Sequence, residues 1–373
     1  MNGGQTEEGR VTDDEDPGTP ARLSRRRFLT AAGGAGAAAG AIAGGSAAFA
    51  FTDGPAWAAA LSAPAKRAAT PSPDASAEPT PISSGGGLSV AHCSVTAGLL
   101  APLTPRLTDK VLYPTPAVPA QPGRLRRFEL VAEDARYEVA RDKFIDAWTF
   151  NGSIPGPTIR VTEGDAVEVR FTNRSSHYHT VHFHGIHAAS ADGLEPMVAP
   201  GGEFIYKFTA EPFGLFIYHC HVMPLDEHIS RGLYGMLIID PPRARPAAQE
   251  LVMMMNGYDT AHKGDNDLYS VNGPAGYYVR YPIPISVGKP VRVYLANITE
   301  IDRINSFHLH ANVFQQIPSV KALTPTNWDD TVMLCQGQRA ILEFTYPEAG
   351  RYMFHAHQSE FAQKGWSGFF EAT

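Results

Sequence analysis

The segments HTVHFH at residues 179–184 and YHCH at residues 218–221 return later in the chain as NSFHLH at residues 305–310 and FHAH at residues 354–357. A third pair joins them, because DAVEVRFTN at residues 165–173 parallels KPVRVYLAN at residues 289–297. Short segments rich in β-branched and aromatic residues are typical of strands. A repeat of three motifs in the same order therefore predicts two copies of one all-β domain.

Length and composition agree with two β domains that carry an extension. The chain has 373 residues, of which 35 are Gly and 30 are Pro, and such a content suits many turns better than long helices. The net charge of −7 gives no indication of a nucleic-acid partner. Only three cysteines occur, which excludes a disulfide-framed scaffold. Cys93 and Cys335 are either one disulfide or two buried thiols, and the sequence does not decide between them.

The N-terminal part has the composition of a targeting segment. Residues 24–29 read SRRRFL and precede an Ala- and Gly-rich apolar run to about residue 51, which resembles a twin-arginine export signal. The alternative is a membrane anchor, although so many small residues make a poor permanent span. We therefore expect export to the cell envelope or the extracellular space, with the cleavage site left open. The expected organisation is a disordered N-terminus with this signal over residues 1–59, a flexible linker over residues 60–88, and two domains over residues 89–243 and 244–373.

The tripeptide His219-Cys220-His221 indicates metal chemistry on two faces of one strand. Residues i and i+2 of a strand point to the same face and residue i+1 to the other, so the two imidazoles and the thiolate face different centres. Such a strand predicts a copper protein that accepts single electrons at one site and uses them at a neighbouring cluster. Zinc is the main competitor, but a structural zinc site needs only four ligands. Three further His-x-His pairs accompany the tripeptide, namely His182/His184, His308/His310 and His355/His357.

Together with NGSIPGPTIR at residues 151–160, these motifs make the chain resemble a two-domain, laccase-like multicopper oxidase over roughly residues 125–373. The resemblance implies two cupredoxin-like Greek-key β-sandwich domains. It also implies a type 1 (blue) copper in the first domain, held by His179, Cys220 and His228. An electron donor is then expected at the exposed edge of His228. Leu233 falls at the axial position and gives no bond, which should raise the reduction potential.

The resemblance also implies three further coppers, which makes four in each chain. The second domain has Asn305 and Ala356 where the first has His179 and Cys220, so it keeps no blue site. The remaining eight histidines suit a trinuclear cluster, with His182 and His308 on the type 2 copper. The type 3 pair would take His184, His219, His221, His310, His355 and His357. Each domain supplies four of these ligands, and the resemblance implies a homotrimer with each cluster between neighbouring chains.

The implied reaction is one-electron oxidation of a reducing substrate, coupled to four-electron reduction of O2 to water. Phenols, aromatic amines and metal ions all remain possible donors. Asp192 and Glu360 are candidate proton relays, although solvated loop carboxylates are an equal alternative. Two other functions compete, a copper-containing nitrite reductase and a non-catalytic copper-binding protein. His182, His221 and the second-domain pairs argue against the reductase, which needs an Asp in place of His182 and no histidine right after the blue-site Cys. The second-domain pairs argue against a non-catalytic protein, because a carrier needs only one copper.

Overall fold

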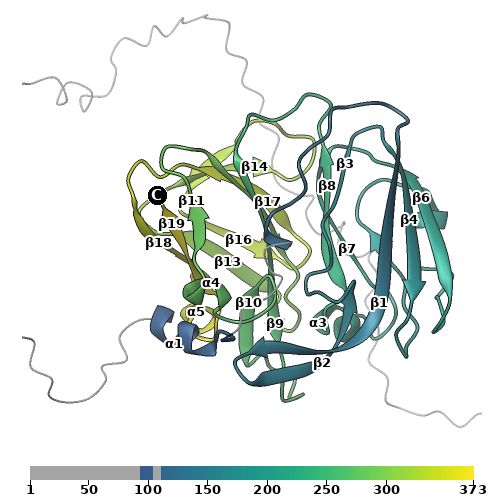
Figure 1. Ribbon diagram of the computed structural model, residues 1–373, viewed down its shortest axis with the longest axis horizontal. Helices are drawn as coiled ribbons and strands as arrows, with labels where there is room; N and C mark the ends of the chain where they lie inside the picture. The colour runs from purple at the N-terminus through teal and green to yellow at the C-terminus, as the bar shows by residue number, and fades with distance from the viewer. Residues whose placement is uncertain (1–92, 104–110) are drawn as a thin grey trace, which may run out of the picture. The chain divides into compact units, whose positions relative to one another are not determined.

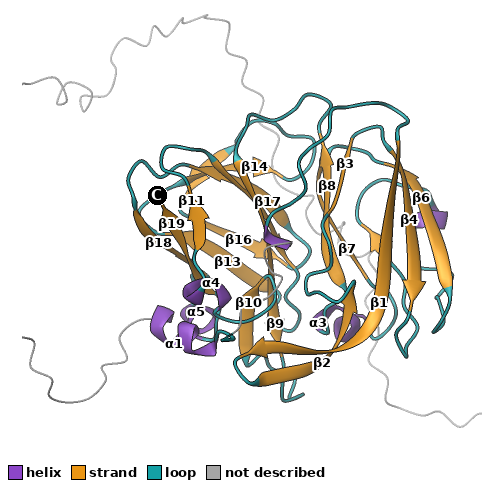
Figure 2. Ribbon diagram, in the orientation of Figure 1, coloured by secondary structure: helices purple, strands orange, loops and turns teal. Residues whose placement is uncertain are grey.

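The computed structural model describes residues 93–103 and 111–373, and Figure 1 shows their arrangement. The predicted export signal and the whole predicted linker lie outside the described residues. Within the described part, no helix combines the length and the apolar character needed to cross a membrane. Strands dominate these residues, and the few helices are short (Figure 2). The all-β prediction is therefore confirmed.

The first half of the described chain is a sandwich of two four-stranded sheets. One sheet has the order β2 (Lys143–Phe150), β1 (Leu125–Ala140), β4 (Ala166–Asn173) and β6 (Glu203–Thr209). The other has the order β3 (Ile159–Thr162), β8 (Tyr234–Asp240), β7 (Gly214–His219) and β5 (His182–Phe183). Phe150, Phe171 and Tyr218 are buried in the core cluster to which both sheets contribute. Alternating burial along β4 places Val167, Val169 and Phe171 inside, as the strand period requires.

The second half is a larger sandwich. Its first sheet has the order β10 (Leu268–Val271), β9 (Gln249–Tyr258), β12 (Val291–Asn297), β17 (Arg339–Phe344), β14 (Phe314–Pro318) and β15 (Asn327–Asp329). Its second sheet has the order β11 (Ile283–Ile285), β19 (Ser367–Ala372), β18 (Gly350–His355), β13 (Ile304–Leu309) and β16 (Thr331–Cys335). The helices of the described residues are α1 (Cys93–Leu100), α3 (Leu225–Ser230), α4 (Tyr277–Arg280) and α5 (Ser359–Gln363), with one 3-10 turn at Ala189–Ala191.

The sequence repeat becomes a repeat of strand pairing. Strand β1 runs parallel to β4 in the first half, and β9 runs parallel to β12 in the second. The antiparallel pair β5 and β7 sets His182 opposite His219, and the pair β13 and β18 sets His308 opposite His355. The repeated motifs therefore occupy equivalent positions in the two sandwiches.

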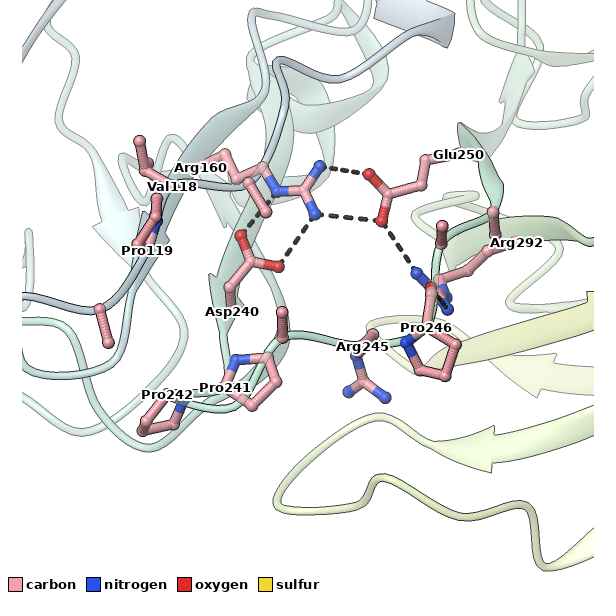
Figure 3. A pocket seen from close by; sticks show the side chains of 15 residues that line it. Val118, Pro119, Arg160, Asp240, Pro241, Pro242, Arg245, Pro246, Glu250 and Arg292 are labelled. Carbon is pink, nitrogen blue, oxygen red and sulfur yellow. Dashed lines mark hydrogen bonds and ion pairs between the residues drawn. The ribbon is translucent and has the colours of Figure 1, made fainter.

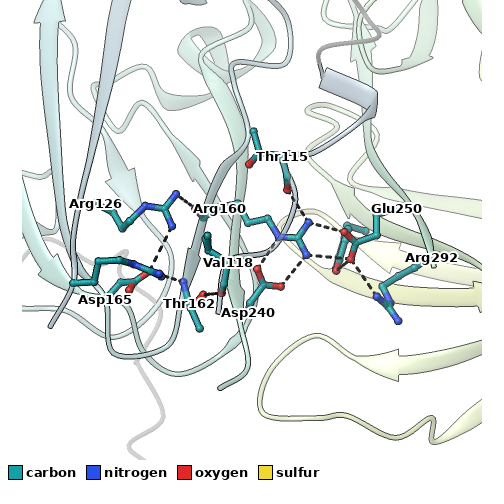
Figure 4. Close-up of polar contacts among 11 residues, drawn as sticks. Thr115, Val118, Arg126, Arg160, Thr162, Asp165, Asp240, Glu250 and Arg292 are labelled. Carbon is teal, nitrogen blue, oxygen red and sulfur yellow. Dashed lines mark hydrogen bonds and ion pairs between the residues drawn. The ribbon is translucent and has the colours of Figure 1, made fainter. Parts of the chain in front are cut away.

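A buried ion network joins the two halves (Figure 4). The guanidinium of Arg160 on β3 donates two hydrogen bonds to Asp240 (2.7 and 2.9 Å) and two to Glu250 (2.6 and 3.1 Å). Arg292 on β12 donates to Glu250 at 3.1 Å and to Glu343 at 2.6 Å. All of these residues except Glu343 border a cavity of about 520 Å³ between the end of β8 and the start of β9 (Figure 3). Since Asp240 belongs to the first half and Glu250 to the second, the arginine bridges the junction with satisfied charges.

Candidate metal centre

Three side chains of the first half converge on one point in its core. Cys220 directly follows β7, His228 lies in α3, and His179 lies in the loop between β4 and β5. The Cys220 Sγ lies 3.2 Å from Nδ1 of His228 and 3.7 Å from Nδ1 of His179, and the two Nδ1 atoms are 3.1 Å apart. All three residues are buried. The structure thus brings together the three residues that the sequence assigned to one site.

The electrostatics of this triad fit a copper ion. Burial raises the pKa of the Cys220 thiol to about 11 and lowers the pKa of His179 to about 3 and that of His228 to about 4. The imidazoles are therefore neutral and have free lone pairs, whereas the thiol needs a bound cation to lose its proton. Two imidazoles and one thiolate match the set that copper prefers. Leu233 is buried in the same core cluster as Cys220 and has no donor atom to offer.

The buried ring of Trp148 packs against the two imidazoles of the triad. Its ring centroid lies 4.6 Å from that of His228 and 5.3 Å from that of His179. The guanidinium of Arg231 stacks on the indole at 4.6 Å. Because His228 is only 4 % exposed, the expected open edge of this ring is small. Sequence reasoning missed Trp148, which lies about 80 residues before its partner and carries no motif of its own.

Four histidines of the first half form a group that we call the first half-set: His182, His184, His219 and His221. The ring centroid of His182 lies 5.1 to 5.2 Å from those of the other three. Nε2 of His184 is 3.2 Å from Nε2 of His219. The pairing of β5 with β7 produces this arrangement, since it sets the two His-x-His segments side by side.

The second half repeats the arrangement in what we call the second half-set: His308, His310, His355 and His357. The ring centroid of His308 lies 5.0 to 5.2 Å from those of the other three. Nε2 of His310 is 2.9 Å from Nε2 of His355. Three ligand atoms of each half-set lie within 4.8 Å of one another, which is close enough to share a metal. No such group in the described residues mixes the two half-sets, so one chain does not bring all eight histidines together.

Hydrogen bonds orient the half-set rings. Nδ1 of His182 donates to the backbone oxygen of Asp192 at 2.7 Å, and the Asp192 carboxylate is 3.2 Å away. Nδ1 of His308 donates to the backbone oxygen of Asp330 at 2.9 Å. These bonds leave each Nε2 free for a metal. The structure thus places Asp192 beside His182, and it adds Asp330 as the equivalent residue of the second half.

Glu360 occupies a different setting. It lies in α5, and its carboxylate forms an ion pair with Lys364 at 2.7 Å. Its side chain is exposed to solvent. The described contacts of this carboxylate thus include a lysine one turn away and none of the half-set histidines. Of the two alternatives that the sequence offers for Glu360, a proton relay or a solvated carboxylate, this setting matches the solvated carboxylate.

Arg339 is a residue of the second half that reaches the first half-set. Its Nε donates to the backbone oxygen of Leu215 on β7 at 3.1 Å, and its Nη1 lies 3.5 Å from Nδ1 of His184. The contact spans 155 residues of sequence, so no local pattern predicts it.

Cys335 is a free, exposed thiol, which agrees with neither the disulfide nor the buried thiol considered for it.

Comparisons with known proteins agree with this geometry. Residues 132–244 and residues 245–373 each match a family model described as multicopper oxidase. A crystal structure of a multicopper oxidase superposes with a TM-score of 0.67 and 43 % identity, covering 75 % of this chain and 99 % of that chain.

Two curated relatives are similar over shorter stretches. A copper-containing nitrite reductase of Neisseria meningitidis serogroup A is 31 % identical over 231 residues, which are 56 % of this chain and 59 % of that protein. An L-ascorbate oxidase of Cucurbita pepo var. melopepo is 42 % identical over 106 residues, which are 26 % of this chain and 18 % of that protein. The chain thus spans less than two thirds of the length of either relative.

The family assignment rests on matches to both halves of the chain. Two adjoining family models cover residues 132–373, and the similar crystal structure is matched over almost its whole length. The buried Cys-His triad and the two half-sets supply the ligands that copper needs. The chain therefore belongs to the multicopper oxidase family, a family of copper-binding oxidoreductases built from cupredoxin domains.

Proposed function

We propose that the protein is a laccase-like oxidase that takes single electrons from a reducing substrate and reduces O2 to water. Four donor molecules each lose one electron, and O2 takes up four electrons and four protons to give two water molecules. The observation that carries this proposal is the pair of equivalent histidine half-sets, the first of which includes the two histidines on either side of Cys220. An electron carrier would need the triad alone.

The proposed copper content is four ions per chain. His179, Cys220 and His228 would hold the blue copper, which supplies one-electron redox chemistry when bound. His182 and His308 would hold the type 2 copper, and the other six half-set histidines the type 3 pair. Cys220 is one backbone step from His219 and from His221, so the chain provides a short covalent path between the two centres. The Asp192 carboxylate lies 3.2 Å from Nδ1 of His182 and is the proposed relay on that side.

A homotrimer would complete the cluster. Each chain offers one half-set in each half, and a head-to-tail contact between copies can bring a first half-set against a second one. Exposed apolar side chains support this contact on both sides. Leu194 and Met197 follow Asp192 in the first half, Trp328 and Met333 lie on either side of Asp330 in the sequence of the second half, and all four are more than half exposed. Heterologous contacts of this kind close into a ring when the rotation allows it.

A nitrite reductase is the second candidate, because several curated relatives carry that name. That reaction needs only one copper besides the blue site. The second half-set, in which three histidines surround His308, exceeds what that reaction needs.

We also propose export through the twin-arginine route to the cell envelope or the extracellular space, on the basis of residues 24–51. The proposed donors are phenols, aromatic amines or metal ions.

The optical spectrum of the copper-loaded protein, recorded together with O2 consumption, tests this proposal. We expect an intense blue thiolate-to-copper band, a near-ultraviolet shoulder from a bridged copper pair, and one O2 consumed for four donor molecules. A blue band without the shoulder and without O2 consumption would exclude the oxidase and favour the reductase or a carrier. Sedimentation of the same sample tests the trimer, and a monomer with an intact shoulder would contradict it.

A further inference from the structure

Two cavities lie at the junction of the halves, and two carboxyl groups, those of Asp226 and Glu300, line both. The first has a volume of about 340 Å³ and an acidic lining that includes Asp146, Asp226, Glu227, Asp259 and Glu300. The second has a volume of about 580 Å³ and is lined by His184, His219, Met223, Asp226, Glu300 and Gln336 among others. Asp226 is exposed, whereas Glu300, just beyond β12, is buried. Glu300 is thus the buried acid that borders both the acidic cavity and the cavity that reaches two histidines of the first half-set.

Glu300 is held in place and is largely shielded from water. It is 6 % exposed, and its side chain hydrogen-bonds Gln336. Its backbone oxygen accepts a hydrogen bond from the amide of Asn266 at 2.9 Å. The charges that face it are Arg303 and Asp226. Burial, with a smaller contribution from Asp226, raises the pKa of this carboxyl group, so it retains its proton at higher pH than an ordinary glutamate.

The backbone beside Glu300 is unusual. Ile301 has φ +67°, a left-handed conformation that a β-branched residue rarely adopts. Such strain persists only where the surroundings enforce it, and it concentrates at functional positions. Here Ile301 directly follows a buried carboxyl group that lines two cavities at once. The strained residue therefore lies next to the buried acid that borders both cavities.

We propose that Glu300 is a proton relay between the acidic cavity and the cavity at His184 and His219. The inference rests on the proposed oxidase function, because O2 reduction consumes four protons for each pair of water molecules formed. The Glu300 carboxyl group gives up its proton on the histidine side and regains one from water in the acidic cavity, so it is unchanged after each transfer. Asp192, whose carboxylate lies 3.2 Å from Nδ1 of His182, belongs to a different part of the half-set. The two carboxyl groups would therefore deliver protons from different sides.

The test uses the full-length, copper-loaded protein and follows two half-reactions separately. In Glu300→Gln, which keeps the size of the side chain and an amide group for Gln336, anaerobic reduction of the blue band by donor should keep its wild-type rate. Reoxidation by O2 should slow by at least about tenfold, as expected on loss of a proton donor. The reoxidation rate of Glu300→Asp should fall between those of the wild type and Glu300→Gln, because the aspartate keeps an acidic proton on a shorter side chain. Glu348→Gln, an exposed glutamate of the second half, is the matched control and should behave as wild type.

Chemical rescue separates a relay from a structural role. Formate should restore the reoxidation rate of Glu300→Ala, because a small acid can enter the space that the missing side chain leaves. A wild-type reoxidation rate in Glu300→Gln overturns the relay, as does loss of the near-ultraviolet shoulder in that variant. If wild-type protein itself consumes no O2, the proposed oxidase function fails first, and the relay fails with it. The wild-type measurement therefore distinguishes the two failures.

Discussion

The ion network at the junction makes a quantitative prediction for Arg160→Met. The substitution keeps an unbranched side chain of similar length but removes a guanidinium that makes four hydrogen bonds to two carboxylates. Glu250 keeps Arg292 and the hydroxyl of Tyr294 as partners, at 3.1 and 2.7 Å. Asp240 is different, because its side chain is only 7 % exposed and Arg160 supplies the hydrogen bonds to both of its carboxylate oxygens.

The magnitude follows from that difference. Breaking a buried ion pair while leaving one charge behind costs about 3–5 kcal/mol. We expect Arg160→Met to lower the free energy of unfolding by that amount, with most of the loss due to Asp240. The double variant Arg160→Met/Asp240→Asn removes the orphaned charge as well and should recover about 0.5–3 kcal/mol. The Asp240→Asn substitution is therefore expected to restore part of the free energy of unfolding that is lost in Arg160→Met.

Urea unfolding of the copper-free protein measures these changes. Tryptophan fluorescence and circular dichroism should give coincident transitions before a free energy is extracted, because the chain has two β-sandwiches. Arg170→Met is the matched control, since Arg170 pairs with Glu203 on the surface with about half of each side chain exposed. An exposed pair of this kind contributes at most about 1 kcal/mol. If Arg160→Met costs no more than Arg170→Met, the structural account of the junction is refuted.

Three further predictions concern the metal centres. His310→Ala should keep the blue band, because the triad lies in the other half of the chain. It should lower the rate of O2 consumption at least about tenfold. Loss of the blue band would contradict the separation of the two centres. Leu233→Met offers a thioether next to the triad and should lower the reduction potential in a redox titration of the blue band, whereas an unchanged potential would place the side chain elsewhere. Burial lowers the pKa of His179 from 6.5 to about 3, so in copper-free protein the unfolded chain binds this proton first. Stability should therefore be lost as pH falls from about 6.5 towards 3, and His179→Gln should flatten that slope in urea unfolding.

Local patterns in the sequence, together with the family resemblance that they support, were enough to predict the all-β fold and the groups of side chains at the metal centres. The reason is physical: a His-x-His segment on a strand fixes which rings share a face, and strand pairing then sets His182 opposite His219. The duplication extends the same logic to His308 and His355. The assignment of these groups to individual coppers stays a prediction.

Contacts between distant parts of the chain could not be predicted in this way. Arg339 approaches His184 across 155 residues, and Arg160 meets Glu250 across 90. Such contacts depend on how the halves pack together, and the spacing of apolar and polar residues along a strand does not predict that packing. Glu300 illustrates the same limit, because its importance comes from two cavities that exist only in the folded chain.

The separation of the two half-sets has a genetic consequence if copies assemble into the proposed ring. A chain with His182→Ala keeps an intact second half-set, and a chain with His310→Ala keeps an intact first one. Neither chain alone can build a whole cluster. Co-assembly in equal amounts should pair an intact first half-set with an intact second one at roughly a quarter of the contacts. Two inactive alleles would then complement each other. Activity would depend on each contact between neighbouring chains and not on either chain alone.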